Sequence, residues 1–160
     1  MPLLRPGDPF PQLDFSIPGG QTLEVPGSLT GDFGVVLFNR GAWCPYCAAQ
    51  LRAFQRAHRS LAEAGINVAA LWVDNEETTA RFTDQHEITF PLGHSADARA
   101  VAELTGAFVN EDPLYLQSTG FVLDPEGTVV VSVYSSGAIG RLVPEDVVGL
   151  VTYLRSKQPA

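Results

Sequence analysis

The segment between residues 32 and 73 contains the pattern that most constrains the fold of this chain. A continuous apolar run, DFGVVLFN (32–39), predicts a buried central strand. A long helix is expected over 45–64, where apolar residues recur at three- and four-residue spacing, and Gly65 ends it. A second apolar run, INVAALWV (66–73), predicts another buried strand. Two strands joined by a helix of this length are typical of a parallel βαβ unit.

Shorter elements are expected in the rest of the chain. In order they are a hairpin over 17–25 turning at Gly19-Gly20, a helix from Asn75 to about Gln85, an extended piece over 88–94, a helix from Ser95 to about Leu104, strands over 118–124 and 128–134, and a helix over 144–156. The turn PEG joins the two late strands and makes them antiparallel. The sequence therefore predicts a single α/β domain spanning 1–160, with a mixed central β-sheet flanked by helices and an N-terminal β-hairpin extension.

The composition excludes several classes of partner. The formal net charge is −8 and no Lys/Arg run occurs, whereas nucleic acids and anionic membranes require basic patches. The first residues, MPLLRPGDPFPQLDF, lack the apolar core of a signal peptide, which favours the cytoplasm. Disulfides in that compartment are usually transient and catalytic rather than structural.

Both cysteines of the chain lie in the short stretch GAWCPYC, directly after the first predicted strand. Pro45 suits the first position of a helix, which puts Cys44 at the N-cap and Cys47 one turn inside. Free backbone N–H groups and the positive end of the helix dipole then favour the Cys44 thiolate. Arg40, four residues upstream, would add a cationic partner. The spacing predicts a redox-active pair.

The geometry of this spacing suits disulfide exchange. Residues three apart on a helix have Cβ atoms about 5–6 Å apart, and a disulfide needs roughly 3.5–4.5 Å, so a small adjustment at the N-cap closes the gap. In the predicted cycle Cys44 attacks an oxidised partner, and Cys47 then attacks Cys44 and releases the reduced product. A zinc site is disfavoured because there is no second Cys pair and only three scattered histidines. Two packed core cysteines without a redox role remain an alternative.

Four stretches in a fixed order carry a resemblance to a known family. They are RPGDPFPQLDF (5–15), GVVLFNRGAWCPYC (34–47), TFPLGHSADARAVAELTGA (89–107) and GFVLDPEGTVVVSVY (120–134). Together they resemble the peroxiredoxin-like branch of the alkyl hydroperoxide reductase and thiol-specific antioxidant family, within the thioredoxin-fold superfamily. The resemblance covers nearly the whole chain and implies a thioredoxin-like fold and redox activity without a cofactor or metal.

The family's active-site motif is Pro-x-x-x-Thr-x-x-Cys with a distant Arg. Laid on this chain, the peroxidatic Cys falls on Cys47, the Thr on Cys44 and the Pro on Arg40, while no Arg stands just before residue 120. These departures favour thioredoxin-like dithiol exchange. In the thioredoxin comparison, Thr119 stands near the position of a cis-proline, and Trp43 is expected to pack beside Cys44 as a shield or as a plain apolar lid.

Three functional hypotheses follow. The first is a thiol–disulfide oxidoreductase acting in redox homeostasis or antioxidant defence. Its catalytic residues are Cys44 and Cys47, which form the redox-active disulfide. The expected supporting residues are Arg40, Trp43, Pro45 and Thr119. The second is a thiol peroxidase that reduces hydrogen peroxide or alkyl hydroperoxides, and the third is a non-enzymatic redox sensor. The implied partners are a thiol reductant, either a thioredoxin-like protein or glutathione, and a peroxide or protein-disulfide substrate. The resemblance is also compatible with a homodimer.

Overall fold

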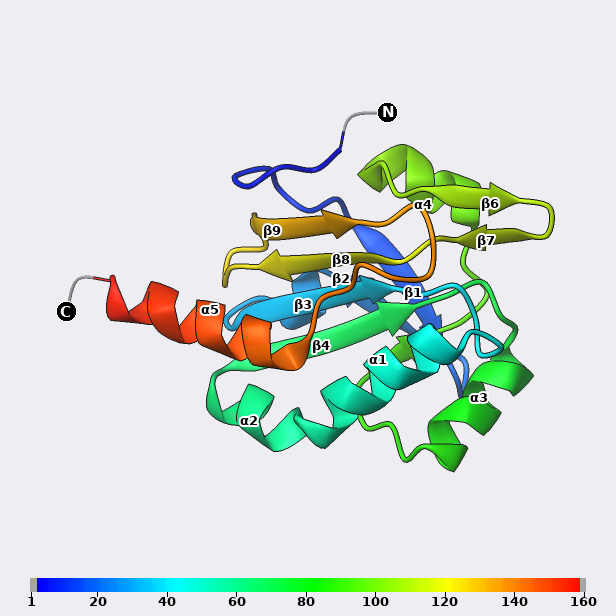
Figure 1. The fold of residues 1–160 in the computed structure, drawn as a ribbon, viewed down its shortest axis with the longest axis horizontal. Helices are drawn as coiled ribbons and strands as arrows, with labels where there is room; N and C mark the ends of the chain where they lie inside the picture. The colour runs from blue at the N-terminus through cyan, green and yellow to red at the C-terminus, as the bar shows by residue number, and fades with distance from the viewer. Residues whose placement is uncertain (1–2, 159–160) are drawn as a thin grey trace.

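A five-stranded mixed sheet forms the centre of the molecule in the computed structural model, which describes residues 3–158 (Figure 1). From one edge to the other its strands are β5 (Leu92–Gly93), β4 (Ile66–Leu71), β3 (Phe33–Phe38), β8 (Thr119–Leu123) and β9 (Val129–Tyr134). β3 pairs parallel with β4 and antiparallel with β8, and β8 pairs antiparallel with β9. The predicted mixed sheet is therefore confirmed.

Two hairpins lie outside this sheet. β1 (Leu13–Ile17) and β2 (Gln21–Val25) form the predicted N-terminal hairpin, and both glycines of its turn have positive φ. A short 3-10 helix, η1 (Gly27–Leu29), follows it. The second hairpin, β6 (Val109–Glu111) with β7 (Leu114–Leu116), was not predicted. Its strands are only three residues long, too short for an alternation of apolar and polar residues to be read from the sequence.

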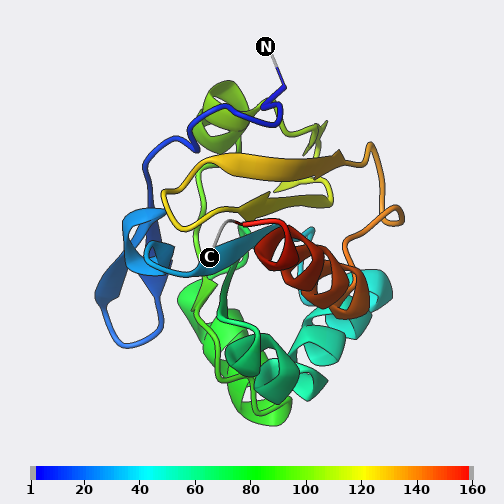
Figure 2. The same cartoon turned by 90° about the vertical axis from the view of Figure 1, so that its left-hand side faces the viewer.

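Helices cover both faces of the sheet, and the first hairpin shares one of these faces with a single helix (Figure 2). The helices are α1 (Pro45–Arg56), α2 (His58–Glu63), α3 (Glu76–Gln85), α4 (Ala98–Thr105) and α5 (Pro144–Ser156). Buried side chains of α1, α2 and α5 pack on one face, while those of α4 and the β1–β2 hairpin pack on the other. A layer on each face explains why β3 is buried along its whole length.

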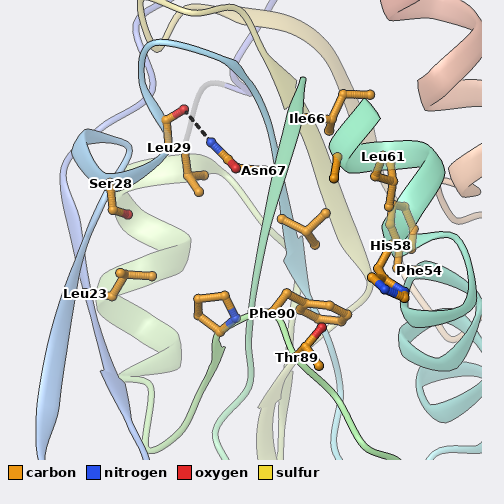
Figure 3. Close-up of a pocket in the computed structure, with 13 residues that line it drawn as sticks. Leu23, Ser28, Leu29, Phe54, His58, Leu61, Ile66, Asn67, Thr89 and Phe90 are labelled. Carbon is orange, nitrogen blue, oxygen red and sulfur yellow. Dashed lines mark hydrogen bonds between the residues drawn. The ribbon is translucent and has the colours of Figure 1, made fainter. Parts of the chain in front are cut away.

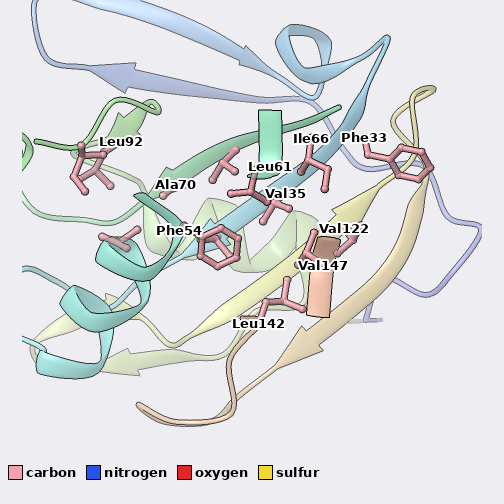
Figure 4. Close-up of a cluster of buried hydrophobic side chains, with 14 of the residues drawn as sticks. Phe33, Val35, Phe54, Leu61, Ile66, Ala70, Leu92, Val122, Leu142 and Val147 are labelled. Carbon is pink, nitrogen blue, oxygen red and sulfur yellow. The ribbon is translucent and has the colours of Figure 1, made fainter. Parts of the chain in front are cut away.

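Successive residues of β3 supply the two layers of the core alternately. Val35 points into the layer beneath α1 and α5, which Figure 4 shows, whereas Val36 points into the layer beneath the hairpin. Leu51 and Phe54 of α1 complete the first layer and are fully buried. This packing fixes the position of α1 over the end of β3.

The predicted helix over 45–64 is in fact two helices that meet at Ala57. The His58 ring nitrogen Nδ1 lies 2.9 Å from the Gln55 carbonyl oxygen, which an uninterrupted helix would pair with the N–H of residue 59. This competing contact coincides with the break. His58 is exposed, although its spacing places it on the apolar stripe. Gly65 follows with φ of 70°, in agreement with its predicted role as a stop.

The helix predicted to open at Ser95 begins three residues later. Ser95 has a positive φ of 58° and donates its N–H to the Asp74 carbonyl. Asp97 is the N-cap instead, and its carboxylate accepts the N–H of Ala100. Asp and Ser are comparable N-cap residues, so the sequence pattern alone could not choose between them.

Replacing the buried Leu51 by Ala is expected to lower the free energy of unfolding by about 2–5 kcal/mol, because a cavity opens where α1 meets the sheet. Urea or guanidinium denaturation followed by circular dichroism measures the change. The matched control is Arg52→Ala, an exposed position on the same helix, which should change it by less than about 0.5 kcal/mol. Equal effects at the two positions would contradict this packing.

Candidate active site

The two cysteines lie where β3 ends and α1 begins, as the sequence predicts. Cys44 is the N-cap residue of α1, with an extended backbone, and Pro45 occupies the first helical position. The Asp74 carboxylate, beyond the end of β4, accepts the N–H of Ala42 at 2.7 Å and holds the loop between β3 and α1. Because β3 holds the start of this loop, α1 its end and Asp74 its middle, the dithiol has one defined position.

The structure brings the two sulfurs into a common network. The Sγ atom of Cys44 accepts the backbone N–H of Cys47 at 3.4 Å, as the predicted N-cap requires. Both residues are free thiols, and both are buried, with exposed fractions of 1% and 0% for Cys44 and Cys47. The Sγ atom of Cys47 in turn accepts the backbone N–H of Arg40 at 3.2 Å.

Arg141 brings a guanidinium group to this network from a distant part of the chain. It lies between β9 and α5, and its Nη2 is 3.0 Å from the Sγ of Cys47 and 4.0 Å from that of Cys44. No sequence pattern indicated this residue, and no Arg stands just before β8. Arg141 supplies a guanidinium from a different loop.

Neutral acceptors hold Arg141 in place. Its Nη1 donates to the side-chain oxygens of Asn39 at 2.9 Å and Gln50 at 2.7 Å, and its Nε donates to the Ala138 carbonyl. Gln50 also donates to the Leu142 carbonyl, which ties α1 to the segment that carries Arg141. Amide oxygens orient the guanidinium without cancelling its charge, so that charge remains available to the sulfurs.

Gly120 of β8 gives this segment room to approach the sheet. A Cβ atom at that position would lie 2.8 Å from Cδ1 of Leu142. Two polar residues in the sequence hint at the Arg141 contacts: Asn39 at the end of the first apolar run, and Gln50, three residues after Cys47 on the same helix. Neither residue indicates that its partner is Arg141.

Arg40 makes the predicted cationic contact with Cys44. Its Nη1 lies 3.6 Å from the Cys44 Sγ, and its Nη2 donates to the Tyr115 hydroxyl at 2.9 Å. The guanidinium carbon lies 5.0 Å from the ring centre of Trp43 and 5.1 Å from that of Tyr115. Tyr115 belongs to β7, so the unpredicted hairpin contributes directly to the site.

The two thiols differ in acidity. Burial acts to raise the pKa of Cys44, but hydrogen bonds from the side chain and backbone of Cys47 and from Arg40, with the charge of Arg141, bring that pKa below its ordinary value. Burial and the hydrogen bond to Cys44 raise the pKa of Cys47, and Arg141 and the backbone N–H groups of Gly41 and Arg40 offset this only partly. Although Cys47 has the shorter contact with Arg141, the first negative charge of the pair rests chiefly on Cys44.

The predicted supporting residues Trp43 and Thr119 make no hydrogen bond to either sulfur among the contacts of residues 3–158. The Trp43 side chain is 56% exposed and packs edge-on against Tyr115, so it forms part of the rim of the site. Thr119 is buried, and its hydroxyl donates to the Gln117 carbonyl within its own turn. Supporting roles for Trp43 and Thr119 stay predictions.

An apolar cavity also lies away from the dithiol. A cavity of about 400 Å³ opens between the first hairpin, the α1–α2 junction and β4, and Figure 3 shows it lined by Leu29, Phe54, Leu61 and Phe90, among others. None of the residues around the sulfurs lines it. Within residues 3–158, no three His, Cys, Asp or Glu side chains lie close enough together to hold a metal ion.

The sheet, the helix-capping thiol and its neighbour define a protein of the thioredoxin-fold class with a dithiol site. The AhpC/TSA family profile matches residues 6–132, which is most of the chain, and the chain therefore belongs to this family of peroxiredoxins. It is accordingly a thiol-dependent oxidoreductase.

Comparison with individual proteins agrees with this membership. The chain is 28% identical to a peroxiredoxin of Methanothermobacter thermautotrophicus, over 91% of this chain and 70% of the relative. It is 27% identical to alkyl hydroperoxide reductase C of Mycolicibacterium smegmatis, over 91% and 82% of the two chains.

Solved structures of low sequence identity share the fold. The AhpC structure of Mycobacterium bovis superposes with a TM-score of 0.80 at 21% identity, covering 100% of this chain and 97% of that one. A cysteine-to-serine mutant of the peroxiredoxin 6 of Arenicola marina superposes with a TM-score of 0.81 at 16% identity, covering 95% and 74%. These similarities confirm the predicted thioredoxin-like α/β fold. Over residues 3–158, no helix is long and apolar enough to cross a membrane.

The two thiols should alkylate at different rates. Because the pKa of Cys44 is lowered and that of Cys47 is raised, Cys44 should be the more ionised thiol at neutral pH and react first with iodoacetamide. Peptide mapping by mass spectrometry over a pH series separates the two sites. A Cys44 midpoint equal to that of free cysteine would overturn this assignment.

Proposed function

We propose that this protein is a thiol peroxidase in which Cys47 attacks the peroxide and Cys44 resolves the product. The observation that carries the proposal is the pair of donors on the Cys47 sulfur, the Arg141 guanidinium at 3.0 Å and the Arg40 backbone N–H at 3.2 Å. Fixed donors of this kind stabilise the Cys47 thiolate, which is the nucleophile of the reaction. The family motif, which aligns its peroxidatic Cys with Cys47, supports the same assignment.

In the first step one negative charge is shared by the pair. Transfer of the Cys47 proton to Cys44 gives a Cys47 thiolate beside a Cys44 thiol. The thiolate attacks the distal oxygen of the hydroperoxide, an S–O bond forms, and the O–O bond breaks. The departing alkoxide or hydroxide takes the proton of Cys44, so the products are a Cys47 sulfenic acid, a Cys44 thiolate and an alcohol or water.

The second step uses the thiolate that the first step leaves behind. Cys44 attacks the Cys47 sulfur, the disulfide forms, and hydroxide leaves and is protonated by solvent. An external thiol then reduces the disulfide to the starting dithiol. A thioredoxin-like protein or glutathione supplies suitable thiols, and the cytoplasm is the compartment that keeps such donors reduced. The resemblance to the family is compatible with a homodimer.

Thiol–disulfide exchange, with Cys44 as nucleophile, is a second candidate. The observation that favours it is the lowered pKa of Cys44 at the N-cap of α1. The two functions use the same disulfide, but they differ in which sulfur reacts first and with which oxidant.

Single substitutions of the cysteines distinguish the two functions. Cys44→Thr restores the hydroxyl that the family motif has at this position, and the variant should still consume one equivalent of peroxide rapidly but stop at the sulfenic acid. Cys47→Ser should lose rapid oxidation. Stopped-flow oxidation and trapping of the sulfenic acid with dimedone measure both outcomes.

The opposite pattern would contradict the proposed roles. Rapid formation of a mixed disulfide between Cys44 of Cys47→Ser and a model disulfide, with release of one thiol, would favour disulfide exchange if Cys44→Thr also reacted with peroxide no faster than free cysteine. Oxidation and reduction without repeated turnover on any thiol donor would indicate the redox sensor.

Removing the Arg141 guanidinium should slow the peroxide step. Arg141→Gln removes the charge 3.0 Å from the Cys47 sulfur, and the second-order rate constant for peroxide should fall by about 10²-fold, as when one donor to a developing oxyanion is removed. Arg141→Lys should recover part of this loss, because the charge returns without the planar fork. Equal rates in Arg141→Gln and the unmodified protein would refute this role.

A further inference from the structure

Two aromatic rings and a hydroxyl group hold the Arg40 side chain beside the dithiol. Its guanidinium lies against the rings of Trp43 and Tyr115, which also pack edge-on against each other, and it donates to the Tyr115 hydroxyl. Contacts with two aromatic rings limit the motion of a side chain that is normally flexible. The remaining donor, Nε, is buried and has no hydrogen-bond partner among residues 3–158. The group is therefore directed toward Cys44 by its aromatic neighbours rather than by an acidic residue.

The two guanidinium groups of the site are divided between the two sulfurs. Arg40 approaches Cys44 at 3.6 Å, and Arg141 approaches Cys47 at 3.0 Å but Cys44 only at 4.0 Å. The two arginines also come from different segments, one from the loop before α1 and one from the segment before α5. The nearest guanidinium is therefore a different one for each sulfur.

We propose that Arg40 sets the rate of disulfide formation by keeping Cys44 as a thiolate directed at the oxidised Cys47, while Arg141 serves the peroxide step. This inference rests on the proposed peroxidase function. Tyr115 and Trp43 are positioning residues that act through Arg40. Because Arg40 occupies the proline position of the family motif, this control of the second cysteine arises from a departure of this chain from that motif.

Fast disulfide formation protects the enzyme from its own substrate. A Cys47 sulfenic acid that meets a second hydroperoxide before Cys44 reaches it forms a new S–O bond while the O–O bond breaks, which gives a sulfinic acid and a second alcohol or water. That product no longer forms a disulfide. Arg40 therefore determines how much peroxide the site withstands during turnover.

The first test measures Cys44 directly, without any peroxide. In a Cys47→Ser background, Arg40→Gln should lower the rate of Cys44 alkylation at pH 7 about tenfold and move its midpoint to higher pH, since an opposite charge nearby favours the thiolate. The variant retains Arg141, whose Nη2 lies 4.0 Å from the Cys44 sulfur, and it also retains Tyr115, which contacts Arg40, and Asp74, which accepts the N–H of Ala42. Arg56→Gln, an exposed position of α1, is the matched control and should change neither quantity.

The second test follows turnover with hydrogen peroxide and a thiol donor. Arg40→Gln should accumulate Cys47 sulfinic acid at about one tenth of the peroxide concentration that the unmodified protein requires, as measured by mass spectrometry. Arg40→Lys should partly restore resistance, and Tyr115→Phe, which removes the hydroxyl but keeps the ring, should give an intermediate loss. Circular dichroism melts establish that each variant is folded.

The outcomes separate this inference from the proposed function. If the alkylation profile of Cys44 shifts but peroxide oxidises neither cysteine faster than a free thiol, the peroxidase proposal fails and the control of Cys44 by Arg40 stands. If peroxide oxidation is rapid but Arg40→Gln changes neither the alkylation profile nor the sulfinic acid yield, the role of Arg40 is wrong.

Discussion

The rest of the site depends on the hydrogen bonds that stabilise a buried negative charge at the N-cap of α1. Two sulfurs that are almost fully enclosed by protein can hold such a charge only if fixed donors replace water. The Cys47 N–H, the Arg40 N–H and two guanidinium groups provide them. The βαβ connection positions the amides, and distant segments hold the arginine side chains in place.

Among the residues that the structure describes, neither of the two arginines near the sulfurs pairs with an acidic side chain. Arg141 is oriented by the neutral oxygens of Asn39, Gln50 and Ala138, and Arg40 by the Tyr115 hydroxyl and two aromatic faces. A carboxylate in either place would satisfy the guanidinium and weaken its effect on sulfur. The net charge of the chain is −8, so the local positive field comes from this arrangement and not from composition.

The sequence predicted the features that depend on local patterns. The apolar run through Val36, the stop at Gly65 and the N-cap position of Cys44 follow from hydrophobic periodicity and from the backbone preferences of Gly and Pro. The predicted helix start was wrong where two residues, Asp97 and Ser95, are comparable N-caps. The sequence also missed the helix break at Ala57, where the His58 side chain competes for a backbone carbonyl. The short β6–β7 hairpin was missed for lack of a readable period.

By itself the sequence determined that a pair of cysteines begins a helix after a buried strand, because Cys-x-x-Cys spacing, Pro45 and the apolar run are all local. Only the tertiary structure decided which cations serve each sulfur. Arg141 stands 94 positions from Cys47, and Tyr115 stands 75 from Arg40. Contacts of this range depend on strand order and on close approaches such as that of Leu142 to Gly120, which no periodicity in the chain encodes.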